Sequence, residues 1–249
     1  MSRIQYPCTY ELIDAIDDRS NPHAYFKDFE SRVEAAPELA RVWAARESQF
    51  RLLDRPSWEQ LKTEALPYLT VKDPKGRGWH QLISILNQAR AHNYLKRRGC
   101  TDIRFVPRAT KAGIETPDIE ANWNAREILC EVKTLEISDD EVRARSDILG
   151  RATQHVLPLE FHAKFCRTIE KAQRQLYGYR QSSESECIAF LVINFDDWLG
   201  EYKGDYYRQI DENLNGWNAD DCRIVLYNQT TIFHSVIGMA NAEVINEDG

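Results

Sequence analysis

Three charged residues in the middle of the chain have the types and the spacing to hold a divalent cation beside a reacting phosphate. Asp118 follows Pro117, and Glu131 and Lys133 lie two residues apart within EILCEVKT, residues 127–134. Alternating apolar and polar residues predict a strand here. Successive side chains of a strand point to opposite faces of a sheet, so Glu131 and Lys133 would share one face.

A short turn between two strands would bring Asp118 beside Glu131. Two adjacent carboxylates repel each other unless a cation or a proton lies between them. Mg²⁺ prefers oxygen ligands and commonly takes one or two carboxylates together with waters and the phosphate oxygens of a substrate. Lys133, next to such an ion, would orient or deprotonate a water or stabilise charge on the phosphate. The residue types therefore predict metal-assisted hydrolysis of a phosphodiester. The alternative is an exposed Glu–Lys pair on an edge strand, which contributes little to stability.

Apolar periodicity predicts the elements that must position these residues. Residues 79–98 place apolar side chains at helical spacing and end before Gly99, which is typical of a helix terminus. After this helix we expect strands at 103–107, 118–121 and 127–134, an amphipathic helix at 160–179, a buried strand at 187–194, a helix at 204–214, and strands at 222–227 and 231–236. This order predicts an α/β fold, a mixed sheet layered with helices.

Pro117-Asp118, followed after twelve residues by Glu131-Val132-Lys133, resembles the motif of the PD-(D/E)XK nuclease superfamily. The resemblance extends over residues 79–194 and implies a restriction-endonuclease-like core, with the motif on its second and third strands. It implies that Asp118 and Glu131 bind Mg²⁺, for which Mn²⁺ can substitute. It also implies that the backbone carbonyl of Val132 assists them and that Lys133 is the catalytic lysine.

Many exonuclease-like members of this superfamily carry Gln-x-x-x-Tyr on the next helix. This chain has two overlapping matches, at 173–177 and at 175–179, and the sequence leaves both open. Helical spacing slightly favours Gln175, because it shares a polar face with the lysines of the same helix. The substrate-binding residues that we expect on this helix are Lys164, Lys171, Gln173 and Gln175.

Members of the superfamily often place a metal-binding glutamate on the first core helix, but residues 79–98 contain no acidic residue. Gln88 and His92, one turn apart, are the nearest substitutes, and we include Gln88 among the expected substrate-binding residues. Without that carboxylate, a one-metal mechanism is still available. The same departure also favours a catalytically inactive module on this fold.

Charge is distributed unevenly along a chain whose net charge is −7. Residues 76–111 hold eight Lys and Arg against one acidic residue, and residues 161–180 hold five against one, whereas residues 181–249 are strongly acidic. A polyanion responds to local charge, because salt limits the reach of a charge to about 8–10 Å. The two basic segments therefore favour a nucleic-acid substrate, DNA more than RNA, although a solvated helix face is the alternative for each segment alone.

These observations predict a helical accessory region at residues 1–75 and a nuclease-like domain at residues 76–249, separated by the Pro- and Gly-containing stretch 71–78. The accessory region would limit access to the site or bind a partner, either another protein or a second copy of the chain. No apolar run approaches the ~20 residues of a membrane span, and the six cysteines lack C-x-x-C spacing. We therefore expect no membrane partner, reduced thiols and a cytoplasmic location.

The predicted function is a Mg²⁺-dependent nuclease that acts on DNA. Three alternatives stay open from the sequence. The first is a nucleic-acid-binding module without catalysis on the same fold. The second is a protein-interaction module that uses the helical first third and the acidic last third. The third is a hydrolase that uses the same carboxylates on a small phosphorylated substrate.

Overall fold

The computed structural model describes residues 3–16, 21, 23–71, 79–107, 115–135, 156–157, 159–193, 203–214, 222–228 and 243–246. The chain forms two compact units, Met1–Arg98 and Gly99–Gly249. The predicted boundary after residue 75 falls within residues 72–78, which lie outside the described residues. The predicted role of residues 1–75 in limiting access or binding a partner stays a prediction.

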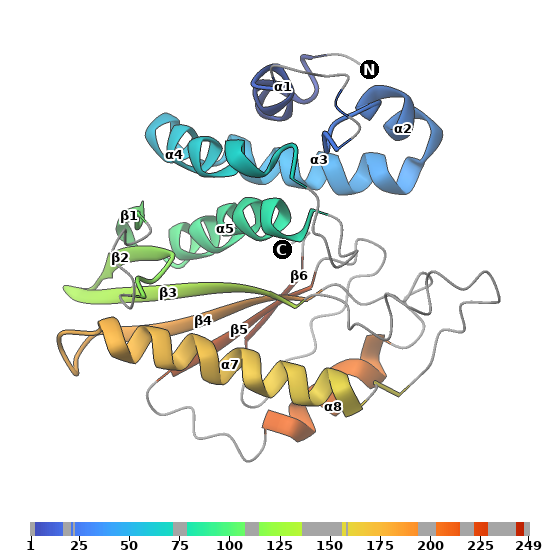
Figure 1. Ribbon diagram of the computed structural model, residues 1–249. Coiled ribbons are helices and arrows are strands. Elements are labelled where there is room, and N and C mark those ends of the chain that lie inside the picture. The colour runs from blue at the N-terminus through green and yellow to red at the C-terminus, as the bar shows by residue number, and fades with distance from the viewer. Residues whose placement is uncertain are drawn as a thin grey trace. The chain divides into compact units, whose positions relative to one another are not determined.

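The first unit is built from helices (Figure 1). They are α1 (Pro7–Asp14), α2 (Phe29–Ala35), α3 (Pro37–Arg51), α4 (Arg55–Ala65), the short 3₁₀ helix η1 (Leu66–Tyr68) and α5 (His80–Arg97). Its core is aromatic: the ring of Phe29 meets those of Tyr6, Phe26 and Trp43 edge to face, at centroid distances of 5.5–6.1 Å. Such T-shaped contacts add to the stabilisation gained by burying the rings.

A buried carboxylate joins α3 to the beginning of α1. Glu47 accepts hydrogen bonds from the backbone N–H groups of Cys8 and Thr9, each at 2.9 Å, and from the Thr9 hydroxyl at 2.7 Å. The first N–H groups of a helix have no partner within the helix, and the positive end of the helix dipole favours an anion there. Glu47 therefore stabilises the start of α1 from a distant position in the sequence.

Helix α5 confirms the helix predicted at residues 79–98. It packs against α3 and α4, and Asn93 donates hydrogen bonds to the carbonyl and the side-chain oxygen of Gln49 at 2.8 and 2.9 Å. Gly99, which follows the helix, has φ +85°, a left-handed conformation that glycine adopts without steric cost.

The second unit is an α/β structure around a mixed six-stranded sheet (Figure 1). The strands lie side by side in chain order: β1 (Thr101–Phe105), β2 (Ile119–Trp123), β3 (Arg126–Leu135), β4 (Glu186–Ile193), β5 (Cys222–Asn228) and β6 (Glu243–Asn246). β1, β2 and β3 pair antiparallel, and β3 to β6 pair parallel. The predicted α/β class is confirmed. The strand expected at 231–236 lies outside the described residues, and β6 was not predicted.

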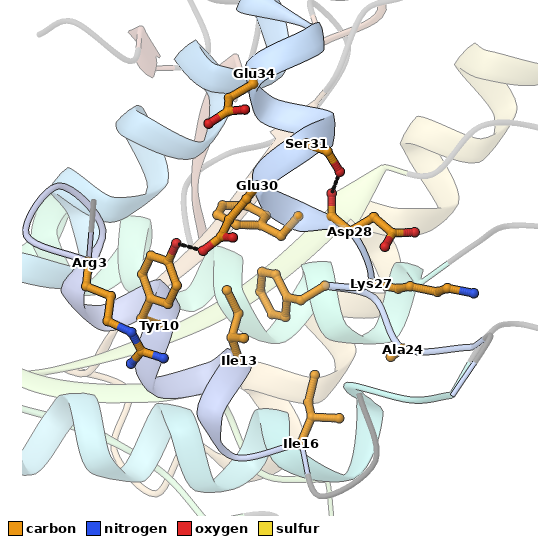
Figure 2. A pocket seen from close by; sticks show the side chains of 12 residues that line it. Arg3, Tyr10, Ile13, Ile16, Ala24, Lys27, Asp28, Glu30, Ser31 and Glu34 are labelled. Atoms are coloured by element: carbon orange, nitrogen blue, oxygen red, sulfur yellow. Dashed lines mark hydrogen bonds between the residues drawn. The ribbon is translucent and has the colours of Figure 1, made fainter. Parts of the chain in front are cut away.

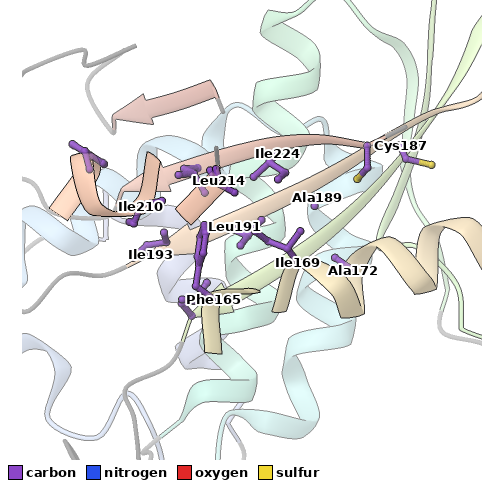
Figure 3. Packing of buried hydrophobic residues seen from close by; sticks show 14 of the residues in the cluster. Phe165, Ile169, Ala172, Cys187, Ala189, Leu191, Ile193, Ile210, Leu214 and Ile224 are labelled. Carbon is purple, nitrogen blue, oxygen red and sulfur yellow. The ribbon is translucent and has the colours of Figure 1, made fainter. Parts of the chain in front are cut away.

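Two helices cover one face of this sheet. They are α7 (Leu159–Tyr179), which lies between β3 and β4 in the sequence, and α8 (Lys203–Leu214). Apolar side chains of α7 meet alternate residues of the strands, as Figure 3 shows for Phe165, Ile169 and Leu191. Leu129 and Leu135 of β3 belong to the same cluster. Because side chains alternate along a strand, the odd-numbered residues of β3 between these two leucines also face α7.

The hairpin between β2 and β3 has a turn of two residues. Asn124 and Ala125 have φ values of 50° and 62°, the left-handed pair that a tight type I′ turn requires and that matches the twist of the two strands. Asn tolerates this conformation, but the Cβ of alanine is strained in it by about 1–2 kcal/mol.

We expect Ala125→Gly to raise the free energy of unfolding by about 0.5–1 kcal/mol, because glycine removes the steric strain but adds some unfolded-state entropy. Urea unfolding followed by circular dichroism measures this difference. The matched control is Ala163→Gly, at an exposed position within α7, which should lower stability by about 1 kcal/mol. Equal effects of the two substitutions would contradict the assigned turn.

Candidate active site

The hairpin brings Asp118 beside the strand that carries Glu131. Ile119 pairs with Cys130, so Asp118 and Glu131 point to the opposite face, toward α7. The N–H of Asp118 donates to the Cys130 carbonyl at 3.1 Å, and Oδ2 of Asp118 accepts from the N–H of Val132 at 2.8 Å. Asp118 is therefore fixed to the β3 backbone on both sides of Glu131, through its N–H on one side and its carboxylate on the other.

Glu131 is a buried carboxylate on an interior strand. Its exposed fraction is 2%, and β3 lies between β2 and β4, so the alternative of an exposed pair on an edge strand is wrong. Burial, and then the negative charge of Asp118, raises the pKa of the Glu131 carboxyl to about 8 against the opposing effect of Lys133. Among the residues that the structure describes, Glu131 Oε2 has no hydrogen-bond partner, a costly state for a buried oxygen.

Lys133 lies on the same face, where its ammonium pairs with Oε1 of Glu131. The same ammonium donates to Oε1 of Gln175 on α7 at 3.2 Å, and Nε2 of Gln175 donates to the Thr116 carbonyl at 2.6 Å. Both ends of the Gln175 amide are thus engaged. Gln175 orients Lys133 and joins α7 to the segment that leads into Asp118.

A second polar contact between α7 and β2 was missed by sequence reasoning. The Tyr179 hydroxyl donates to Oε1 of Glu120 at 2.8 Å, and Nε of Arg104 on β1 donates to Oε2 at 2.9 Å. Glu120 lies two residues after Asp118, so both side chains point toward α7. Tyr179 belongs to the second glutamine motif, at 175–179, but the sequence does not show that Tyr179 and Arg104 contact Glu120. These contacts of Glu120 hold α7 in place one turn beyond Gln175.

The structure brings five of the predicted residues together. Asp118, Glu131, Val132, Lys133 and Gln175 form one cluster through the contacts given above. Three of the other predicted residues lie on α7 and one on α5: Lys164 and Gln173 are half-buried, Lys171 is exposed, and Gln88 is buried.

These contacts distinguish between the two overlapping glutamine motifs. Gln175 bonds Lys133 and Thr116, and Tyr179 bonds Glu120, whereas Gln173 has no described hydrogen bond to the cluster. On α5, the suggested substitute His92 is buried, its Nε2 lies 3.4 Å from the Ser57 hydroxyl, and burial lowers the pKa of its imidazole.

The donor set of the cluster fits Mg²⁺. Among the residues that the structure describes, no group of three or more His, Cys, Asp and Glu side chains lies close enough to hold a metal without further ligands. Asp118 and Glu131 would therefore supply two carboxylates, and main-chain, water or phosphate oxygens would complete the shell, as Mg²⁺ commonly requires. The unpartnered Oε2 of Glu131 is an oxygen that a cation would satisfy.

A cavity of about 500 Å³ lies in the first unit and contains none of the predicted site residues (Figure 2). Ile13, Ile16 and Phe26 supply an apolar part of its lining, and the Tyr10 hydroxyl donates to the Glu30 carboxylate at its wall. Charges of both signs line this cavity, so its chemistry selects no ligand class.

Among the described helices, none combines the length and the apolar character that a bilayer span requires. Comparisons with protein-family models, with curated proteins and with solved structures give no match. The function is therefore inferred from the geometry of the cluster around Glu131.

The raised pKa of Glu131 predicts that the metal-free protein loses stability as pH rises. The unfolded carboxyl titrates near 4.5 and the folded one near 8, so the folded state binds more protons between these values and stability falls across this window. Glu131→Gln mimics the protonated form. We expect its Tm to lie close to that of the wild type at pH 5 and about 2–4 °C or more above it at pH 9.

Thermal unfolding in EDTA, followed by circular dichroism, measures this difference. The control is Glu170→Gln, which removes an exposed carboxylate from α7 and should leave the pH profile close to that of the wild type. A Glu131→Gln variant whose Tm falls with rising pH as steeply as that of the wild type would contradict the buried, raised carboxyl.

Proposed function

We propose that the protein is a Mg²⁺-dependent nuclease that hydrolyses phosphodiester bonds of DNA. One observation carries the proposal: two carboxylates on adjacent strands share a face, one has a buried oxygen with no partner among the described residues, and a lysine lies beside them. The order of the elements supports it, because antiparallel β1–β3 and parallel β3–β4 with α7 between them are compatible with a restriction-endonuclease-like core.

In this proposal Asp118, Glu131 and the Val132 carbonyl hold Mg²⁺ or, in its place, Mn²⁺. When bound, the metal polarises the phosphate and makes a nearby water more acidic. Lys133 orients that water or balances charge on the phosphate, and Gln175 positions Lys133 through its side-chain oxygen. Lys171, one turn from Gln175, and Lys164 would bind phosphates of the substrate.

A binding module without catalysis is the second candidate. The observation that favours it is the ion pair between Lys133 and Glu131, which balances the Glu131 charge without a metal. The absence of an acidic residue from residues 79–98 favours it as well. Such a module would bind DNA with an affinity that falls with salt and would gain nothing from Mg²⁺.

Cleavage assays separate the two candidates. The purified protein, supplied with Mg²⁺ or Mn²⁺, should cut at least one of plasmid, linear and branched DNA, and EDTA should stop the reaction. Lys133→Ala should lower the rate at least about 100-fold, the usual range when a group that stabilises charge in the transition state is removed. Arg126→Ala removes an exposed charge from the same strand and should retain activity. Equal rates for Lys133→Ala and Arg126→Ala would exclude the assigned role.

Metal binding gives an independent readout of the carboxylates. We expect Mn²⁺ binding, measured by electron paramagnetic resonance without DNA, to be lost in Asp118→Asn and in Glu131→Gln. Lys133→Ala should retain or strengthen it, because the competing ammonium is gone. Glu170→Gln is the carboxylate control. Wild-type affinity in both carboxylate variants would show that the metal, if any, binds elsewhere.

The two glutamines of α7 are distinguished by substitution. Gln175→Ala releases Lys133 and the Thr116 carbonyl, so we expect kcat to fall at least tenfold while the folded state is retained. The fold-decrease in kcat caused by Gln173→Ala should be at least tenfold smaller than that caused by Gln175→Ala, because Gln173 makes no described contact with the cluster. Single-turnover cleavage measures both effects, and a larger loss in Gln173→Ala would reverse the assignment.

A further inference from the structure

The outward face of α7 is strongly basic. Arg167, Lys171 and Arg174 are exposed, at intervals of three and four residues. Because residues at this spacing lie on one side of a helix, the three charges form a continuous stripe. The opposite side of α7 is buried against the sheet through Phe165, Ile169, Ala172 and Leu176. The stripe therefore faces away from the sheet while the helix itself is held firmly in place.

The charges of this stripe are not neutralised within the described part of the chain. Arg167, Lys171 and Arg174 make no described hydrogen bond or ion pair, even though Glu170 lies among them. Three other exposed arginines of the same unit do pair with carboxylates: Arg104 with Glu120, Arg208 with Asp205, and Arg223 with Glu186. Unpaired cations on one face of an acidic protein are available to an external polyanion.

The stripe is continuous with the candidate active site. Lys171 lies one turn before Gln175, whose side chain contacts Lys133, and Lys164 lies about two turns further toward the helix start. From Lys164 to Gln175 the helix rises about 16 Å, close to the axial length of about five base pairs of DNA. A nucleic-acid backbone whose phosphate reaches Lys133 would therefore follow the stripe.

A membrane surface fits this face poorly. Amphipathic helices bind bilayers by burying their apolar side in the interface, and the apolar side of α7 is already occupied by the core of the second unit. An acidic polypeptide shares the negative charge of DNA but lacks its regular phosphate spacing. Charge complementarity together with continuity from the Lys133 cluster favours a nucleic-acid backbone.

We propose that the face of α7 formed by Lys164, Arg167, Lys171 and Arg174 binds the phosphate backbone of duplex DNA beside the reacting bond. The inference rests on the proposed function for the identity of the substrate, and it adds Arg167 and Arg174 as binding residues. Binding along this face needs neither the metal nor Lys133, so it is measurable without cleavage.

The test uses the full chain and a fluorescently labelled 20-base-pair duplex, with binding followed by anisotropy in EDTA over a series of salt concentrations. Arg167→Glu with Arg174→Glu should raise Kd at least tenfold at low salt. Loss of two phosphate contacts should also reduce the slope of log K against log salt by about 1.8. The control with the same charge change is Arg41→Glu with Arg126→Glu, at two exposed arginines outside the stripe. Its Kd and its salt dependence should be close to those of the wild type.

Arg167→Gln with Arg174→Gln is a milder variant that keeps the test decisive if charge reversal impairs folding, which thermal unfolding reports. The proposal is overturned if the α7 variants and the control bind the duplex equally well. It is also overturned if polyglutamate or phosphatidylserine vesicles compete for the stripe as effectively as unlabelled duplex.

Cleavage measured in parallel separates this inference from the proposed function. Loss of duplex binding in the α7 variants, with no cleavage by the wild type, would support DNA binding by this face of α7 and reject the proposed nuclease activity. Unchanged duplex binding in the α7 variants, with cleavage that depends on Lys133, would reject DNA binding by this face of α7 and support the proposed nuclease activity.

Discussion

The burial of one carboxylate, Glu131, constrains the rest of the second unit. A carboxylate that is removed from water needs a proton, a cation or strong hydrogen bonds. Here one oxygen has the Lys133 ammonium, and the other has no partner in the described part of the chain. An apolar residue at position 131, between Leu129 and Leu135, would be buried at a lower cost in free energy. The sheet instead holds two carboxyl groups, Asp118 and Glu131, close together under α7, which raises the pKa of Glu131. The cost of this arrangement is understandable where the group has a chemical task.

Helix α7 has two roles, and residues on different sides of the helix carry them. Phe165, Ile169, Ala172 and Leu176 anchor it to the strands, whereas Gln175 and Tyr179 contact the polar groups beside Asp118. Because the apolar anchor and the polar contacts belong to one rigid helix, the orientation of Lys133 depends on the packing of the core. The exposed charges of Arg167, Lys171 and Arg174 on the remaining side are then available for binding, since they make no described contact with the sheet or the cluster.

Much of the second unit follows from the sequence because local pattern determines it. Alternation along 127–134 and the apolar run at 187–194 specify β3 and β4, and the 3.6-residue period of 160–179 specifies α7. The placement of Glu131 and Lys133 on one face follows from the same alternation, and a short turn between the two strands predicts Asp118 beside Glu131. What the sequence does not show is partnership across long separations: Glu120 reads as an ordinary polar strand residue until Tyr179 and Arg104 are placed against it. β6 is too short to produce a pattern, and the buried polar residues of α5, Asn87 and Asn93 among them, depart from the amphipathic period that predicted the helix.

The tight turn between β2 and β3 has a consequence for how the protein acquires its cluster of charges. Asp118 and Glu131 are separated by only thirteen positions along the chain, and the turn at Asn124 and Ala125 brings them together without help from β4, β5 or either covering helix. Closure of so short a loop is fast, on the order of microseconds for a hairpin, and local contacts form at lower entropic cost than distant ones. We therefore expect the two acidic groups to meet early in folding, while water still surrounds them, and to become desolvated only when α7 docks.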